Sequence, residues 1–387
     1  MNAPQTNRIR TVANAMLILL FLAVLWIPLC DSVFKFDPSP APNEKRALAE
    51  FPNFSFKPAS WRDYLAGLEK YYNDHFGFRK TLLRWEHKWK RGLFRESSVT
   101  EAMIGRDGWL YLARGGMVDN MLGNLSYSDA QLAAWRQVFQ TRRDWCAARG
   151  IAYQLVIAAE KHSVYPEHLP TWIPAARKTD QIGQLVAYLK TNSTVPVLDL
   201  RVPLRLAKTN LLTFHVTDTH WNDYGAFIGY EALMKTLAQQ RPELKPLPLD
   251  AFEIRHSQQP GGDLAIMLAQ ERSLVETNHI SLVPRSPLTA IATKADRSLS
   301  VRQQQKPTDP AIFVSENPAA RGTVVMFHDS FAVALQPFLA QNFNRVLYVW
   351  QHDWDTAFLI QQKPDVVIDE IAERSFYRGN PAAWENE

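Results

Sequence analysis

The regular alternation of short apolar runs and helical segments near the C-terminus constrains the fold most strongly. Residues 323–327 and 345–350 are apolar runs typical of strands, and residues 331–342 between them have helical spacing. The order repeats with a helical segment at 355–362 and another apolar run at 365–369. Strands that alternate with helices predict parallel β-α-β units in one sheet, with helices on both faces.

The middle of the chain continues this pattern. Ser128 and Gln131 form a capping box that predicts a helix ending at Gly150, and the apolar run at 151–158 then suits a buried parallel strand. Further elements are expected as a helix at 179–190, a strand at 195–200 and a helix at 223–237. The stretch 242–321 is rich in Pro, Ser and Gln and breaks the rhythm. We expect it to be a large irregular insertion.

An uncharged run near the start of the chain bears on its location. Residues 12–29 carry no charge and follow Arg8 and Arg10. A run of about 18 apolar residues is long enough to cross a membrane, and basic residues before it favour a cytoplasmic N-terminus. A cleaved signal peptide and a buried helix are the alternatives. The expected organisation is a cytoplasmic tail at 1–11, an uncleaved single-pass signal anchor at 12–29, a linker at 30–60 and, outside the cytoplasm, a domain at 61–387.

Composition excludes several classes of protein. The chain has 43 basic and 39 acidic residues, a balance too even for an electrostatic nucleic-acid binder. Its two cysteines are too few for a disulfide framework or a thiolate metal site. Hydrophobic residues make up 46% and charged residues 21%, which is typical of a globular protein.

Two short segments carry residues suited to acyl transfer. Asp218 stands two positions before His220, where its carboxylate can orient the imidazole. Ser330 follows the strand at 323–327, at the edge where open α/β folds bind ligands and where free helix N–H groups suit an oxyanion. Each pattern alone is also typical of helix capping. Together they predict a Ser-His-Asp arrangement.

These two segments resemble the SGNH-hydrolase-like alginate O-acetyltransferase family of the AlgJ and AlgX type. Further segments similar to that family lie at 43–52, 72–79, 105–111, 161–167, 262–265, 316–318, 363–370 and 373–374. The resemblance implies a three-layer α/β/α domain with a parallel sheet, in which Ser330, His220 and Asp218 form the triad. It also implies an enzyme of the bacterial inner membrane and periplasm that O-acetylates an exopolysaccharide. The implied partners are a membrane-bound O-acyltransferase that exports acetyl groups and other polysaccharide synthesis or secretion subunits.

The chain departs from the wider SGNH group at His328, which stands where Gly usually precedes the Ser by two positions. The oxyanion hole is therefore expected to differ, with the backbone N–H of Ser330 as one donor. Three further residues are candidate substrate contacts, each with a structural alternative. Trp221 either stacks on a sugar or packs in the core, Lys161 either lines the site or is solvated, and Arg374 either contacts substrate or forms a structural ion pair.

The predicted chemistry is two-step acetyl transfer through an acetyl-serine, which needs no cofactor and no metal. The first alternative is a polysaccharide acetylesterase with the same triad. The second is a non-catalytic, membrane-tethered subunit of a polysaccharide secretion complex. A third, a metal enzyme that uses His215, Asp218 and His220, fits the sequence less well.

Overall fold

The computed structural model describes residues 3–34, 36, 49–52, 61–78, 101–174, 179–301 and 311–384. The chain divides into two compact units, which are Met1–Ser98 with Ile266–Gln270 and Val99–Ala265 with Glu271–Glu387. The domain boundaries expected from the sequence stay a prediction. Most of the linker expected at 30–60 lies outside the described residues.

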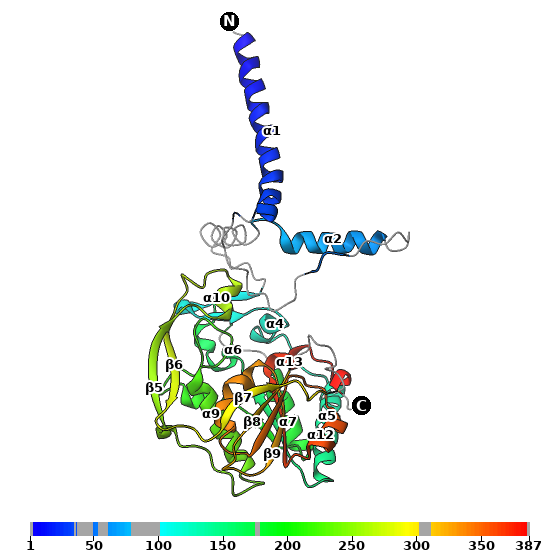
Figure 1. Cartoon of the computed structure of the whole chain (residues 1–387), viewed down its shortest axis with the longest axis vertical. Helices are drawn as coiled ribbons and strands as arrows, with labels where there is room; N and C mark the ends of the chain where they lie inside the picture. The colour runs from blue at the N-terminus through cyan, green and yellow to red at the C-terminus, as the bar shows by residue number, and fades with distance from the viewer. Residues whose placement is uncertain are drawn as a thin grey trace. The chain divides into compact units, whose positions relative to one another are not determined.

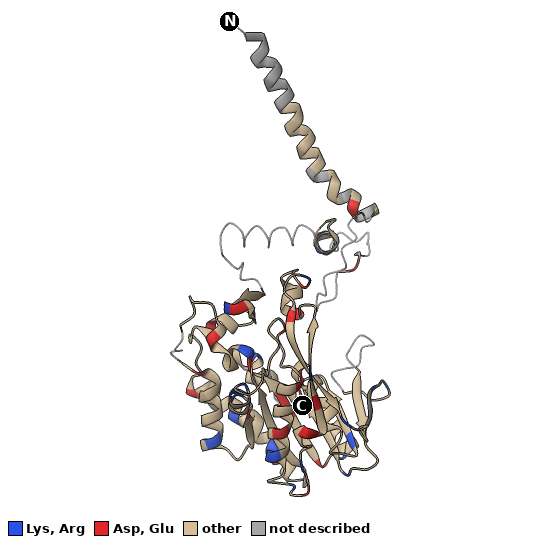
Figure 2. Ribbon diagram, turned by 90° about the vertical axis from the view of Figure 1, so that its left-hand side faces the viewer, with Lys and Arg blue, Asp and Glu red and all other residues tan. Residues whose placement is uncertain are grey.

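The first unit contains helices α1 (Ala3–Phe34) and α2 (Trp61–His75). Helix α1 includes the uncharged run, and Asp31 is the only charged residue among those of α1 whose side chains are described (Figure 2). Within the described part of the chain, no helix is found that has the length and apolar character needed to cross a membrane. The anchor expected at 12–29 is therefore not confirmed.

A seven-stranded sheet forms the centre of the second unit (Figure 1). Its strand order is β4-β3-β11-β9-β10-β8-β7. The strands are β3 (Ala152–Ala158), β4 (Val197–Asp199), β7 (Ile291–Asp296), β8 (Ile312–Glu316), β9 (Thr323–Phe327), β10 (Arg345–Val349) and β11 (Val366–Ala372). The five from β4 to β10 are parallel, whereas β8 pairs antiparallel with both β10 and β7. The predicted α/β fold with a mostly parallel sheet is confirmed.

Helices cover both faces of this sheet (Figure 1). One face carries α5 (Asp129–Ala147), α7 (Gln181–Asn192) and α12 (Thr356–Gln362). The other carries α8 (Arg201–Ala207), α9 (Asp223–Leu237), the 3-10 helix η5 (Ser330–Leu335) and α11 (Gln336–Leu339). The capping box at the start of α5 is present, with Ser128 and Gln131 each accepting a hydrogen bond from the other's backbone. Helix α5 buries Trp135 and Phe139 beneath it, as amphipathic spacing requires.

The stretch 242–321, expected to be irregular, instead contains strands. Strands β5 (Phe252–Gln259) and β6 (Glu276–Pro284) form an antiparallel pair, and β7 and β8 extend the main sheet. Most of β5 is exposed, and buried residues alternate with more exposed ones through part of β6. Such strands lack the continuous apolar runs of buried parallel strands, so the sequence pattern of 242–321 does not predict them. The remaining elements are β1 (Ala102–Ile104), β2 (Leu110–Leu112), α4 (Met117–Met121), α6 (Lys161–Val164), α10 (Asp263–Met267), α13 (Glu373–Tyr377) and the short 3-10 helices η2 (Arg106–Gly108), η3 (Pro166–His168), η4 (Leu249–Ala251) and η6 (Pro381–Trp384).

Candidate functional site

The candidate site lies at the carboxyl ends of the central parallel strands. Ser330 follows β9 closely, Lys161 follows β3, and Arg374 follows β11. Because β3, β11 and β9 are adjacent and parallel, these residues are brought to one edge of the sheet. Asp329 caps η5 by accepting a hydrogen bond from Phe331 N (3.0 Å), which fixes the turn that carries Ser330.

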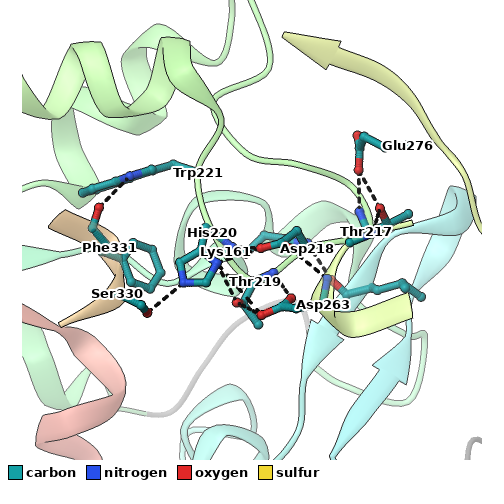
Figure 3. A network of polar contacts seen from close by, with 12 residues as sticks. Lys161, Thr217, Asp218, Thr219, His220, Trp221, Asp263, Glu276, Ser330 and Phe331 are labelled. Carbon is teal, nitrogen blue, oxygen red and sulfur yellow. Dashed lines mark hydrogen bonds and ion pairs between the residues drawn. The ribbon is translucent and has the colours of Figure 1, made fainter. Parts of the chain in front are cut away.

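His220 joins Ser330 and Asp218 in one hydrogen-bonded series (Figure 3). His220 Nε2 lies 2.7 Å from Ser330 Oγ, and His220 Nδ1 lies 2.7 Å from Asp218 Oδ1. Asn222 caps α9 immediately after this segment by accepting a hydrogen bond from Gly225 N (2.9 Å). The structure therefore brings together the three residues that the sequence selected from two distant segments.

Asp218 is held in its ionised form. Burial alone would raise its pKa, but the hydrogen bond and charge of His220, with the N–H groups of Asp263 and His220, hold the pKa well below its usual range. An ionised carboxylate only accepts hydrogen bonds, so His220 Nδ1 carries the hydrogen and Nε2 has a lone pair facing Ser330. This is the arrangement in which histidine acts as a general base toward a serine.

The loop that carries His220 is held by side chains from elsewhere in the fold. Glu276 in β6 accepts hydrogen bonds from Val216 N (3.0 Å), Thr217 N (2.8 Å) and Thr217 Oγ1 (2.7 Å). Lys161 Nζ donates to the carbonyl oxygens of Val216 (3.0 Å) and Leu110 (2.8 Å). These contacts satisfy backbone groups that neither a helix nor a sheet pairs.

Asp263 also holds this loop. Its carboxylate accepts hydrogen bonds from Thr219 N (2.7 Å) and Thr219 Oγ1 (2.6 Å), and its own N–H donates to Asp218 Oδ2 (2.8 Å). The sequence pattern alone predicts no role for Asp263 or Glu276. The Gly-Asp pair at 262–263 is a signal for Asp263 alone, and both residues contact partners more than 40 positions away in the chain.

The three candidate substrate contacts have structural partners. Trp221 is only 2% exposed, and its indole N–H donates to Phe331 O (3.1 Å). Lys161 is only 3% exposed, and burial lowers its pKa to about 8 against the opposing charges of Asp218 and Glu276. These positions favour the core alternative for Trp221 and a loop-holding role for Lys161, which is neither solvated nor open to a polymer.

Arg374 has the most accessible of these three side chains. Its guanidinium pairs with the buried carboxylate of Glu160 and lies 5.1 Å from the centre of the Phe331 ring. Burial raises the pKa of Glu160 and the charge of Arg374 opposes that effect. The ion-pair alternative is therefore present. One quarter of the Arg374 side chain remains exposed, at the edge that carries Ser330.

The start of η5 offers one free backbone donor. Phe331 N–H is taken by Asp329, whereas no hydrogen bond within the described residues engages the N–H of Ser330. This N–H belongs to the same residue as the hydroxyl that lies 2.7 Å from His220 Nε2. It is therefore available to the oxyanion of a tetrahedral intermediate, in which the acyl carbon is bonded to Ser330 Oγ and the former carbonyl oxygen carries the charge.

A metal ion would have to compete with these hydrogen bonds. The described residues that lie close enough to share an ion are Asp218, His220 and Asp263, with one ligand atom each within 4.8 Å of the others. His215, proposed from the sequence as a ligand, is not in this group and stacks on His279 instead. Since His220 Nδ1 is already bonded to Asp218, the donor set fits a hydrogen-bonded network better than a metal centre.

Comparisons with known proteins agree with this fold. The model of a family described as SGNH hydrolase-like domain, acetyltransferase AlgX, matches residues 102–307, which include Asp218, His220 and Asp263 and end before Ser330. The probable alginate O-acetylase AlgJ of Pseudomonas syringae pv. tomato is 28% identical over 200 residues, or 51% of this chain and 49% of that protein. The chain thus spans about half the length of the curated relatives that it matches.

Two solved structures share the fold. PatB1 of Bacillus cereus aligns with a TM-score of 0.52 at 16% identity, covering 73% of this chain and 100% of that one. A DHHW family protein from Eubacterium siraeum aligns with a TM-score of 0.50 at 15% identity, covering 74% of this chain and 100% of that one. At these identities the likeness concerns the fold alone.

Proposed function

Because the chain belongs to the AlgX acetyltransferase family with an SGNH hydrolase-like domain, we propose that it transfers acetyl groups to hydroxyls of an exopolysaccharide through an acetylated Ser330. The observation that carries this proposal is the series Ser330–His220–Asp218, with both hydrogen bonds at 2.7 Å. The curated relatives are named probable alginate O-acetylases, so alginate is the first polymer to test.

In the first step, Ser330 Oγ attacks the carbonyl carbon of an acetyl ester while His220 Nε2 takes its proton. The tetrahedral oxyanion accepts a hydrogen bond from the N–H of Ser330. The ester bond to the donor then breaks, and the proton on Nε2 passes to the departing alkoxide. The products are the donor alcohol and acetyl-Ser330. Asp218 stabilises the imidazolium throughout without taking its proton.

In the second step, a sugar hydroxyl attacks the acetyl carbonyl and gives its proton to His220. Collapse of the second tetrahedral intermediate returns the proton to Ser330 Oγ and releases the acetylated sugar. Water in the same position would give acetate, which is the esterase reaction. Transfer therefore requires that the site hold the hydroxyl in place better than water. Of the three candidate contacts, Arg374 is the one best placed to contact the sugar, because part of its side chain is exposed and it lies over the ring of Phe331, next to Ser330 in the chain.

We further propose that the domain works in the periplasm, tethered to the inner membrane by residues 12–29. The support is the uncharged run itself and the exposed apolar side chains at 16–22 in α1. Acetyl-CoA is a cytoplasmic donor, so this location requires a membrane-bound O-acyltransferase partner that exports acetyl groups. Alkaline phosphatase fused after residue 387 is expected to be active in cells, and an inactive, cytoplasmic fusion would contradict the location.

The reaction is tested by incubating the full chain with a chromogenic acetyl ester and alginate oligosaccharides. We expect acetylated oligosaccharide, and Ser330→Ala is expected to lower its rate at least about 1,000-fold. The matched variant Ser298→Ala alters an exposed turn serine and should leave the rate unchanged. Free acetate as the only product would favour the esterase. Unchanged polymer acetylation in cells that carry Ser330→Ala would contradict Ser330 as the nucleophile.

A further inference from the structure

The direction of one hydroxyl group next to His220 is set by Asp263. Thr219 Oγ1 lies 2.6 Å from Asp263 Oδ2 and 3.1 Å from His220 Nδ1 (Figure 3). A carboxylate oxygen has no hydrogen to give, so the hydroxyl hydrogen of Thr219 points to Asp263. The lone pairs of Thr219 Oγ1 are then left to face His220, where they accept from an N–H and repel a bare nitrogen.

This arrangement selects one form of the imidazole. With the Thr219 hydroxyl donating to Asp263, both oxygens near His220 Nδ1 are acceptors, namely Thr219 Oγ1 and Asp218 Oδ1. The neutral imidazole therefore keeps its hydrogen on Nδ1 and offers the lone pair of Nε2 to Ser330. The carboxylate of Asp263, 3.9 Å from Nδ1, also stabilises the positive charge that forms during the reaction.

The same residue fixes Asp218 from the other side. The N–H of Asp263 donates to Asp218 Oδ2, and the N–H of Gly262 donates to Thr217 Oγ1. Asp263 thus closes a ring of hydrogen bonds with Asp218, His220 and Thr219. A carboxylate that only capped α10 would not need its two oxygens directed back at Thr219.

We propose that Asp263 is a positioning residue that acts through the Thr219 hydroxyl to keep the imidazole hydrogen of His220 on Nδ1, so that Nε2 accepts the proton of Ser330. This inference rests on the proposed function, because it assigns a role within the same general-base step.

The variant Asp263→Asn keeps the shape of the side chain but removes its negative charge and reverses the direction of its hydrogen bond with the Thr219 hydroxyl. Its amide oxygen still accepts from Thr219 N, which turns the amide NH2 toward Thr219 Oγ1. The NH2 then donates to the hydroxyl, and the hydroxyl hydrogen turns to His220 Nδ1. That favours the wrong tautomer. Replacing Thr219 by Val in the same chain removes the misdirected hydroxyl, so the double variant should be no slower than Asp263→Asn alone.

The test follows the reaction of Ser330 in the full chain with phenylmethanesulfonyl fluoride, measured by intact mass and peptide mapping. We expect Asp263→Asn and Thr219→Val each to slow the adduct about 10-fold to 100-fold. Thr219→Ser, which keeps the hydroxyl, should react within about threefold of the parental protein. With a chromogenic acetyl ester, kcat should fall in the slow variants while KM stays near the parental value.

Asp296→Asn is the matched control, because Asp296 also accepts from a backbone N–H and a hydroxyl, those of Ser298, without a histidine beside it. Thermal unfolding identifies any variant that fails to fold. If Asp263→Asn does not fold, the adduct rates of Thr219→Val and Thr219→Ser decide. A slower reaction of Thr219→Val alone supports the inference, and equal rates overturn it.

Two outcomes would overturn the inference. One is a folded Asp263→Asn that reacts at the parental rate. The other is a set of rates in which the losses of Asp263→Asn and Thr219→Val multiply in the double variant. Failure of the parental Ser330 to form the adduct would instead contradict the proposed function, and the inference with it.

Discussion

At the scale of single residues, the site depends on a close approach that glycine allows. A Cβ atom on Gly262 would lie 2.4 Å from Asp218 Cβ and 2.6 Å from Asp218 Oδ2. Alanine at this position must push Asp218 away from His220, and a displacement of about 1 Å in such a network costs roughly 100-fold in rate. We therefore expect Gly262→Ala to lower kcat for acetyl transfer about 100-fold.

Gly229→Ala is the matched control for this change. Its added methyl would meet Leu200, Leu335 and Trp221 at ordinary contact distances of 3.4–3.7 Å. Because Gly229 lies within α9, alanine there should leave kcat unchanged and stabilise the helix by up to about 1 kcal/mol. Equal kcat values for the two variants would show that the approach of Gly262 to Asp218 does not matter.

His328, which lies two residues before Ser330, is expected to make stability depend on pH. Burial lowers its pKa to about 4, and the carbonyl of Asp329 offsets only part of that effect. The unfolded chain binds this proton with a pKa of about 6.5, so it binds more protons than the folded chain between about pH 4 and 6.5. The contribution of neutral His328 to stability is therefore complete above about pH 6.5 and is lost as pH falls toward 4.

The variant His328→Gln tests this dependence, since glutamine does not titrate. The difference between the unfolded pKa of 6.5 and the folded pKa of about 4 corresponds to a contribution of His328 to the free energy of unfolding of about 3 kcal/mol at most. Glu373 acts in the opposite direction, because burial raises its pKa to about 7, so only the difference between the two proteins is informative. Urea unfolding at pH 7 and pH 5 should show a larger loss for the parental protein. Equal losses would mean that His328 is not buried as a neutral group.

At the scale of elements, the sequence predicts the helices and strands that are marked by a pattern of neighbouring residues. The capping box located α5, and continuous apolar runs located β3, β9 and β11, because buried parallel strands need them. The helix expected at 331–342 instead forms as η5 followed by α11. Pro337 explains the break, since it has no N–H to continue a helix.

The residues of the candidate site also divide into those that a local sequence pattern predicts and those that it does not. Ser330, His220 and Asp218 stand beside the starts of helical segments, where sequence patterns are readable. Asp263 and Glu276 reach the His220 loop from a region whose strands carry mostly polar, alternating side chains. Contacts of that sequence separation depend on tertiary packing, which local periodicity does not encode.

A buried ion pair connects α5 to the sheet and gives an element-scale prediction. Arg142 Nη1 lies 2.9 Å from Asp369 Oδ2, and both side chains are at most 1% exposed. Removing one member leaves a buried charge uncompensated, so Arg142→Leu should lower the free energy of unfolding by about 3–5 kcal/mol. Urea unfolding measures it. Arg143→Leu, in the exposed pair with Asp144 on the same helix, should change it by less than about 1 kcal/mol. Similar losses of unfolding free energy in both variants would contradict a special role of the buried Arg142–Asp369 pair in stability.

At the scale of the whole molecule, the residues of the proposed reaction all belong to one unit. Asp218, His220, Asp263 and Ser330 lie in the unit formed by Val99–Ala265 and Glu271–Glu387. The uncharged run lies in the other unit. The proposed chemistry and the proposed location are therefore expected to be separable by truncation.

A truncated chain of residues 99–387 should accordingly keep the reactivity of Ser330 in vitro and lose polymer acetylation in cells. We expect the purified truncated protein to form the sulfonyl adduct at Ser330 within about threefold of the full-length rate, because every contact in the His220 network is retained. Polymer acetylation in cells should disappear, since the chain no longer carries residues 12–29. A cleavable secretion signal placed before residue 99 should restore part of it, if location is what was lost. Full acetylation by the unmodified truncated chain would contradict the proposed periplasmic site of action, whereas an unreactive but folded truncated protein would show that the first unit takes part in the chemistry.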